Sequence, residues 1–296
     1  MVNPIALYAF VYYDCVLRHK RISLMPAFSS AKPVSAKPAS TSAASLKAVG
    51  TRAALSLFLL AAASTSLAGD LTVSAAASLT NAFTDVAHRY ESLYPDAKVA
   101  LNFGASGALL QQMAKGAPVD VFASADQETM DQAEKQNLIN KADRKDFVSN
   151  SLVVIVPADS KQRPSSLKDL TQPAIKRVAI GNPDSVPVGR YTRHALETAK
   201  LWGEVQPKAI FTQNVRQSLD YVARGEVETG FVYGTDAAVM KDKVNVAFSV
   251  PLDMPIRYPV ATVKDSEHAA EAKRFVDFVV SPEGQAILEK HGFLKP

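Results

Sequence analysis

The sequence predicts an α/β protein made of two lobes, and two observations support this prediction. From Leu71 onward, short β-branched runs alternate with amphipathic stretches of helical period, first over residues 71–135 and again over 178–240. Two extended segments, near 148–156 and 256–263, connect the two series. Because alternating strands and helices are typical of parallel sheets covered by helices, we expect a parallel sheet in each lobe. The two extended segments would act as hinges, with a ligand cleft between the lobes.

Lobe 1 is predicted to contain residues 70–150 and 256–296, beginning with three strand and helix pairs. The best defined helix covers about 79–93, since Phe83, Val86, Ala87 and Tyr90 share one apolar stripe and Pro95 ends the segment. The other elements expected in this series are strand 71–75, strand 97–103, helix 107–115, strand 119–123 and helix 126–135.

Lobe 2 is predicted to contain residues 151–255 and begins with a continuous apolar strand that closes at Pro157. The alternation then resumes with strand 178–180, helix 189–200, strand 208–211, helix 214–224, strand 230–233 and helix 235–240. The chain returns to lobe 1 through strand 258–263, a helix over about 269–280, and a last short helix to about residue 290.

The first 68 residues are predicted to be a leader. Residues 1–46 include a Ser/Ala/Pro/Lys tract and are expected to be disordered, or in part mis-annotated if Met25 is the true start. Residues 47–68 have the pattern of a signal peptide: basic Lys47 and Arg52, an apolar run over 53–63, and a small-residue cleavage site ending at Ala68. The apolar run is short for a membrane span, so a retained anchor is the weaker alternative.

The charge distribution argues against a nucleic-acid partner. The whole chain carries a net charge of +4, but residues 1–68 contain seven Lys and Arg and one Asp, which leaves the remainder at −2. The only cysteine, Cys15, also lies in the leader, so the exported part has no thiol for a disulfide or a metal. We therefore expect a free, soluble, exported protein without a cofactor.

Two strand-to-helix junctions each place a serine where a helix begins. Ser78 follows strand 71–75 and Ser106 follows strand 97–103, and neither junction contains a Lys or Arg. The first N–H groups of a helix lack intrahelical partners and lie at the positive end of its dipole, so such junctions attract anions. Because ligands of open parallel sheets bind beyond the carboxyl ends of the strands, we expect both serines in the cleft. The pattern predicts a site that holds an ionised ligand with neutral donors.

Several segments taken together resemble one known family, the periplasmic molybdate-binding proteins of molybdate ABC importers (the ModA family). The resemblance covers about residues 71–294. The matching segments are Ala75-Ala-Ala-Ser-Leu-Thr80, Gly104-Ala-Ser-Gly-Ala-Leu109, Gly116-Ala-Pro-Val-Asp-Val-Phe-Ala-Ser-Ala-Asp126, Gly181-Asn-Pro-Asp-Ser-Val-Pro-Val-Gly189, Asn214-Val-Arg216 and Val232-Tyr-Gly-Thr-Asp236.

The resemblance implies a type II periplasmic-binding-protein fold and a site for a metal oxyanion. The implied donors are the hydroxyl and backbone groups of Ser78 and Ser106, the backbone N–H groups of Val188 and Val215, and the phenol of Tyr233. It further implies a monomeric periplasmic protein that captures molybdate, and also tungstate, and delivers it to an inner-membrane ABC permease. No catalysis, cofactor or membrane insertion is implied.

This sequence departs from the family pattern at two places. Val188 stands where the family often has alanine, and Gly104-Ala105 stands where the family often has hydroxyl side chains. Because Val188 would donate through its backbone, its side chain affects the width of the pocket and hence the size preference among anions.

Three alternative functions are compatible with parts of this pattern. One is binding of another tetrahedral oxyanion such as sulfate. The weaker one is a secreted serine hydrolase using Ser78 or Ser106, although no Gly-x-Ser-x-Gly motif is present. A ligand-sensing domain of a regulator would share the architecture, but the predicted export argues against it.

Charged residues near the predicted cleft are assigned supporting roles. We expect Asp120 and Asp126 to brace the cleft, and Arg190 and Arg216 to remain behind the ligand contacts. The histidines outside the leader, His88, His194, His268 and His291, lack metal-ligand spacing and are expected at the surface.

Overall fold

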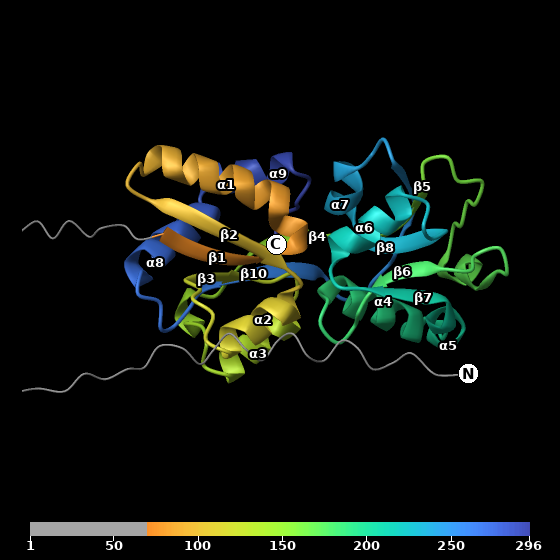
Figure 1. Ribbon diagram of the computed structural model, residues 1–296, viewed down its shortest axis with the longest axis horizontal. Helices are drawn as coiled ribbons and strands as arrows, with labels where there is room; N and C mark the ends of the chain where they lie inside the picture. Colours follow the sequence, from red (N-terminus) through yellow and green to blue (C-terminus); the bar gives the residue numbers. More distant parts are fainter. Residues whose placement is uncertain (1–69) are drawn as a thin grey trace, which may run out of the picture. The chain divides into compact units, whose positions relative to one another are not determined.

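Residues 70–296 are described in the computed structural model (Figure 1), so the predicted leader (1–46) and signal peptide (47–68) lie outside the described residues. The described chain forms two five-stranded sheets, each with helices on both faces. This confirms the predicted two-lobed α/β fold. Lobe 1 contains the sheet of order β2-β1-β3-β10-β4, and lobe 2 the sheet of order β7-β6-β8-β5-β9.

The strands of lobe 1 are β1 (Asp70–Ala76), β2 (Lys98–Gly104), β3 (Val121–Ala123), β4 (Lys145–Asn150) and β10 (Ile256–Thr262). Those of lobe 2 are β5 (Leu152–Pro157), β6 (Val178–Gly181), β7 (Ala209–Thr212), β8 (Thr229–Tyr233) and β9 (Val244–Ser249). Strand β5 is buried along almost its whole length, as expected for an interior strand with helices on both faces.

The sheets are mixed, which corrects the prediction of parallel sheets. Strands β1, β2 and β3 run parallel, but β10 pairs antiparallel with both β3 and β4. In lobe 2, β6, β7 and β8 run parallel, and β5 pairs antiparallel with β8 and β9. The exceptions involve the segments that pass from one lobe to the other. They enter their sheets without the helical crossover that makes consecutive strands parallel.

Figure 1 shows the helices on both faces of each sheet, with α1 opposite α2 and α3 in lobe 1, and α6 and α7 opposite α4 and α5 in lobe 2. The helices of lobe 1 are α1 (Thr80–Leu93), α2 (Ser106–Ala114), α3 (Gln127–Lys135), α8 (Ala269–Val279) and α9 (Pro282–Lys290). The helices of lobe 2 are α4 (Pro187–Thr198), α5 (Trp202–Val205), α6 (Val215–Ala223) and α7 (Gly234–Val239). Short 3-10 turns are η1 (Ala77–Leu79), η2 (Lys141–Asp143), η3 (Leu167–Thr171) and η4 (Gln206–Lys208).

The chain passes between the lobes twice. Strand β4 leads into β5 through the single residue Ser151, and β9 leads into β10 through residues 250–255. The extended segment predicted over 148–156 is therefore two strands in different sheets. Because β4 and β10 are neighbours in the lobe 1 sheet, both crossings lie side by side, which is the arrangement of a hinge.

Two features are absent from the described residues. Among residues 70–296, no helix is long and apolar enough to cross a membrane. The same part of the chain contains no group of three or more His, Cys, Asp or Glu side chains placed to hold a metal ion.

Candidate functional site

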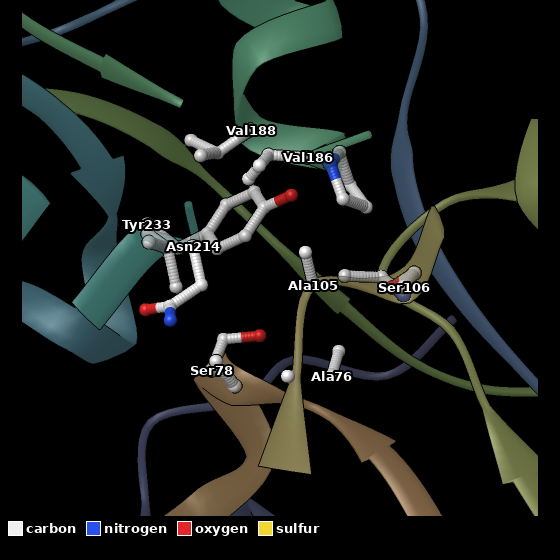
Figure 2. A pocket seen from close by; sticks show the side chains of 13 residues that line it. Ala76, Ser78, Ala105, Ser106, Val186, Val188, Asn214 and Tyr233 are labelled. Carbon is white, nitrogen blue, oxygen red and sulfur yellow. Dashed lines mark hydrogen bonds between the residues drawn. The ribbon is translucent and has the colours of Figure 1, made fainter. Parts of the chain in front are cut away.

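A pocket between the two lobes contains all five residues singled out from the sequence. The space between its lining residues measures about 200 Å³, including the part that is open to solvent. Figure 2 shows the hydroxyl groups of Ser78 and Tyr233 directed towards this common space. Its lining comes from the ends of β1, β2 and β8 and from the starts of α2, α4 and α6. The lining residues are Ala76, Ala77, Ser78, Gly104, Ala105, Ser106, Ala125, Val186, Pro187, Val188, Asn214, Val215 and Tyr233.

The pocket wall contains no Lys, Arg, His, Asp or Glu side chain. Its polar groups are hydroxyls, one amide and the backbone N–H groups at the starts of helices. A site of this composition offers an anion hydrogen-bond donors and helix dipoles in place of a countercharge.

The two serines are buried, and each hydroxyl already has one partner within lobe 1. Ser78 lies in η1, directly after β1, and its Oγ is 3.1 Å from the hydroxyl of Tyr258. Ser106 is the first residue of α2, and its Oγ accepts a hydrogen bond of 3.0 Å from the backbone N–H of Ala125. Neither hydroxyl caps its own helix, which removes the most common structural explanation for a serine at a helix start.

Two helices of lobe 2 begin at the pocket. Helix α4 starts with Pro187, a residue favoured at the first helical position, so Val188 is the second residue of the helix. Helix α6 starts with Val215 and is capped by Asn214, whose side chain accepts from the N–H of Gln217. Within residues 70–296, the N–H groups of Val188 and Val215 have no hydrogen-bond acceptor, although both residues are buried. Both groups are therefore available to a ligand.

Tyr233 ends β8 and is only 1% exposed, yet its hydroxyl has no hydrogen-bond partner in the described part of the chain. Burial raises the pKa of this phenol well above its ordinary value, so the group stays protonated and able to donate. Buried polar groups without a partner are rare in proteins, so this hydroxyl is a candidate ligand contact.

Arginines close to the pocket join the two lobes. Arg190, on α4, donates to Asp126 Oδ2 at 2.7 Å and to the hydroxyl of Thr129 at 2.6 Å, both in lobe 1. Arg216, on α6, donates to Asn81 Oδ1 at 2.8 Å and to the carbonyl oxygen of Ser78 at 3.3 Å. Neither arginine lines the pocket, so both lie behind the predicted ligand contacts.

The two lobes are also connected by a hydrogen bond between backbone atoms. The N–H of Gly107 in α2 donates to the carbonyl oxygen of Ser185 in lobe 2 at 3.0 Å. With the arginine contacts, it places hydrogen bonds between the lobes on several sides of the pocket. The structure is therefore a closed form.

The acidic residues near the cleft are held in place by specific partners. Asp126 caps α3 by accepting from the N–H of Thr129 as well as pairing with Arg190. Asp120 accepts from the N–H of Thr72 and from the hydroxyl of Ser266. Asp236 is fully buried and pairs with Arg216 at 2.5 Å; burial raises the pKa of its carboxyl to about 6, although the arginine opposes this shift.

Two polar residues behind Ser78 were not expected from the sequence. Tyr258 lies in β10, and its hydroxyl is within hydrogen-bond distance of both Ser78 Oγ and the side-chain nitrogen of Asn150. Asn150 is the last residue of β4, directly before the first lobe crossing. The only sequence signal for either residue was its position within a predicted hinge segment, 148–156 for Asn150 and 256–263 for Tyr258.

The surroundings of the serines do not fit a serine hydrolase. In the described residues, the hydroxyls of Ser78 and Ser106 contact a tyrosine and a backbone N–H, and neither contacts a histidine or carboxylate. The four histidines of the described chain are elsewhere: His194 lies beside Asp253, His268 beside Asp120 and His291 beside Asp85, and His88 is exposed. Nothing in this arrangement could remove a proton from a serine nucleophile.

Comparison with known proteins identifies relatives over most of the described chain. Residues 71–294 match the model of a family described as bacterial extracellular solute-binding protein. The molybdate-binding protein ModA of Escherichia coli is 36% identical over 251 residues, covering 81% of this chain and 97% of the relative. YvgL of Bacillus subtilis, whose name describes an ABC transporter substrate-binding lipoprotein, is 37% identical over 81% of this chain and 95% of its own length.

A solved structure supports the same relationship at the level of the fold. The periplasmic molybdate-binding protein of Azotobacter vinelandii superimposes with a TM-score of 0.68 at 23% identity, covering 77% of this chain and all of the other. The family consists of solute-binding proteins and is not a class of enzymes, as the sequence predicted. The chain therefore belongs to the bacterial extracellular solute-binding protein family, and it is similar to the ModA relatives over most of its length.

Proposed function

We propose that this protein is a periplasmic binding protein that captures molybdate, and also tungstate, for an ABC importer. The names of its relatives support the ligand class. The observation that carries the proposal is the hydroxyl of Tyr233, a buried donor without a partner in the described chain, in a pocket that has no charged wall residue. Such a hydroxyl can donate to a small anion, whose oxygen atoms accept hydrogen bonds on all sides.

The proposed contacts come from both lobes. Ser78 and Ser106 of lobe 1 would each donate a hydroxyl and a backbone N–H. Val188 and Val215 of lobe 2 would donate their backbone N–H groups, and Tyr233 its phenol. About seven hydrogen bonds to a charged ligand, at about 1.5–3 kcal/mol each, amount to about 10–20 kcal/mol before desolvation of the dianion and ordering of the lobes are subtracted. The remainder is compatible with tight binding.

Size and protonation would set the selectivity. Sulfate has the same charge and shape as molybdate but is smaller, so it would be discriminated by pocket width, to which the side chain of Val188 contributes. Phosphate often carries a proton near neutral pH. A pocket of donors leaves that proton without an acceptor, which costs binding free energy.

The same relatives support a cellular role. ABC substrate-binding proteins act outside the cytoplasm, and the names of the relatives support an ABC permease as partner. We propose that the signal peptide over residues 47–68 is cleaved after Ala68 and that the released protein is a monomer. The closed form would be the one presented to the permease.

A thermal-shift panel tests the ligand assignment. The purified protein is melted with molybdate, tungstate, sulfate or phosphate at equal low-micromolar concentration. A ligand at about 100 times its Kd should stabilise the folded protein by about 2.7 kcal/mol, which raises Tm by about 5–10 °C for a chain of this size. Molybdate and tungstate should give this shift. An equal shift with sulfate would overturn the selectivity, and no shift with any of the four would overturn the proposed function.

A further inference from the structure

The hydroxyl of Ser78 can either donate or accept, and the choice affects what the pocket can bind. A serine hydroxyl carries one hydrogen, which rotates to suit its partners. If that hydrogen points at Tyr258, a lone pair of the serine oxygen faces the pocket, and it repels an oxyanion. If Tyr258 donates to Ser78 instead, the serine hydrogen is free for the ligand. The neighbouring hydrogen bonds decide between these cases.

The chain of contacts starts at Asn150, whose amide orientation is fixed by the backbone. Its Oδ1 accepts from the N–H of Ser151 at 2.9 Å, so its Nδ2 must face the other way. There it lies 2.9 Å from the hydroxyl oxygen of Thr235 and 3.3 Å from the hydroxyl oxygen of Tyr258. An amide nitrogen can only donate. Asn150 therefore donates to Tyr258.

Tyr258 then has one hydrogen to place. Its side chain is fully buried, and burial raises the pKa of its phenol well above the ordinary value, so the hydrogen is retained. The oxygen already accepts from Asn150. Among the described residues, the remaining group within hydrogen-bond distance is Ser78 Oγ at 3.1 Å. Leaving a buried phenol hydrogen unbonded would cost free energy, so Tyr258 donates to Ser78.

Ser106 reaches the same state by a different route. Its Oγ accepts from the backbone N–H of Ala125 at 3.0 Å, and a backbone N–H can only donate. Its own hydrogen is therefore also free. The two serines of lobe 1 thus present hydrogens to the pocket for the same reason, since each oxygen is already occupied by a donor of its own lobe.

We propose that Asn150 and Tyr258 are positioning residues that turn the hydroxyl of Ser78 towards the ligand and thereby make the pocket selective for oxyanions without a proton. The proposal rests on the proposed function, because it names the residues that set the selectivity of that site. Neither residue lines the pocket, and both act through Ser78.

A double-mutant cycle in molybdate affinity tests this role. Tyr258→Phe removes the donor to Ser78 and should weaken molybdate binding about 5- to 10-fold, the effect of about one hydrogen bond. In a Ser78→Ala background the same substitution should change affinity less than about 2-fold, because the group it acts through is gone. Equal losses in both backgrounds, or no loss in either, would overturn the proposal.

Asn150→Asp provides a second variant if Tyr258→Phe does not fold. The carboxylate has the same shape, but it accepts the hydrogen of Tyr258, which leaves the phenol oxygen free to attract the hydrogen of Ser78. Molybdate affinity should fall more than in Tyr258→Phe, and this loss should be smaller in the Ser78→Ala background. A loss that is the same with and without the Ser78 hydroxyl would contradict the proposal.

A control and a competition assay separate this role from others. Tyr90 is a buried tyrosine whose hydroxyl contacts Glu271 and Arg274 away from the pocket, so Tyr90→Phe should leave molybdate affinity unchanged. In Tyr258→Phe the freed Ser78 can accept a hydrogen, so the ratio of phosphate to molybdate inhibition constants should fall several-fold. An unchanged ratio would contradict the claim that Asn150 and Tyr258 make the pocket selective for oxyanions without a proton. Failure of the unmodified protein to bind molybdate would instead reject the proposed function itself.

Discussion

At the scale of single residues, the hydroxyl of Tyr233 is a buried donor whose hydrogen bond a ligand would supply. Its hydroxyl is buried and has no acceptor within residues 70–296. An unsatisfied buried group of this kind costs about 1–3 kcal/mol of folding free energy. A residue that lowers stability in the empty protein and gains a partner in the complex is typical of a binding site, where stability is given up for affinity.

The substitution Tyr233→Phe should therefore affect binding and stability in opposite directions. Loss of one hydrogen bond to a charged ligand should weaken molybdate binding by about 1.5–3 kcal/mol, whereas the free energy of unfolding of the empty protein should stay the same or rise. Calorimetric titration and urea unfolding measure the two quantities. Tyr90→Phe should give the reverse, because that hydroxyl contacts Glu271 and Arg274: reduced stability and unchanged affinity. A Tyr233→Phe protein that binds as tightly as the unmodified one would exclude the phenol as a ligand contact.

The five predicted site residues and the two residues behind them differ in how visible they are in the sequence. Ser78 and Ser106 stand at strand-to-helix junctions, a local pattern with a direct physical meaning. Asn150 and Tyr258 are 108 positions apart, and their contact depends on the pairing of β4 with β10. No local pattern encodes that pairing, so only the folded structure connects them with Ser78.

At the scale of elements, the starts of α4 and α6 are the part of lobe 2 that meets the pocket. Both helices leave buried N–H groups without acceptors in the described chain. Each begins at the pocket with a residue favoured at a helix start: Pro187 is the first residue of α4, and Asn214 caps α6. Such helix starts bind anions through backbone groups. Side-chain substitutions at Val188 and Val215 would therefore leave these donors intact.

Val215→Pro removes one of these donors without changing the helix. Proline is tolerated at the first helical position, and the preceding Asn214 has the extended backbone (φ −162°, ψ 171°) that proline requires. We expect molybdate affinity to fall about 10-fold or more, with a stability change of about 1 kcal/mol or less. Val215→Ala keeps the N–H and loses buried methyl groups, so it should lower stability and preserve affinity. Equal affinities for the two variants would show that this N–H does not contact the ligand.

The elements also show where sequence patterns stop being informative. The alternation of strands and helices correctly predicted the two-lobed α/β fold, because hydrophobic periodicity is local. The antiparallel entry of β5 and β10 and the presence of β9 were not predicted. Strand direction and pairing depend on partners far away in the sequence, such as Ile256 opposite Asn150, and an extended apolar segment has the same pattern in either direction.

At the scale of the whole molecule, the contacts between the lobes surround the pocket in this closed form. Arg190 and Arg216 extend from lobe 2 to oxygen atoms of lobe 1, and Gly107 meets Ser185 through backbone atoms. Because the proposed ligand contacts also come from both lobes, each lobe contact formed on closure adds to the apparent affinity. A protein that cannot close should bind weakly even with every ligand contact intact.

Gly107→Ala tests this dependence on closure. A Cβ at this position would lie 2.7 Å from the carbonyl oxygen of Ser185 in the other lobe, so the closed form must open slightly to accept it. The open protein has no such conflict, and alanine favours the helix over glycine by up to about 1 kcal/mol. We therefore expect Tm of the empty protein to stay the same or rise and molybdate affinity to fall about 10-fold or more. The decrease in radius of gyration on adding molybdate, measured by small-angle X-ray scattering, should become smaller. Gly203→Ala, where a Cβ meets no atom within 4 Å, is the matched control and should bind and close normally. If Gly107→Ala also binds and closes normally, then the approach of α2 to Ser185 is not part of the bound state.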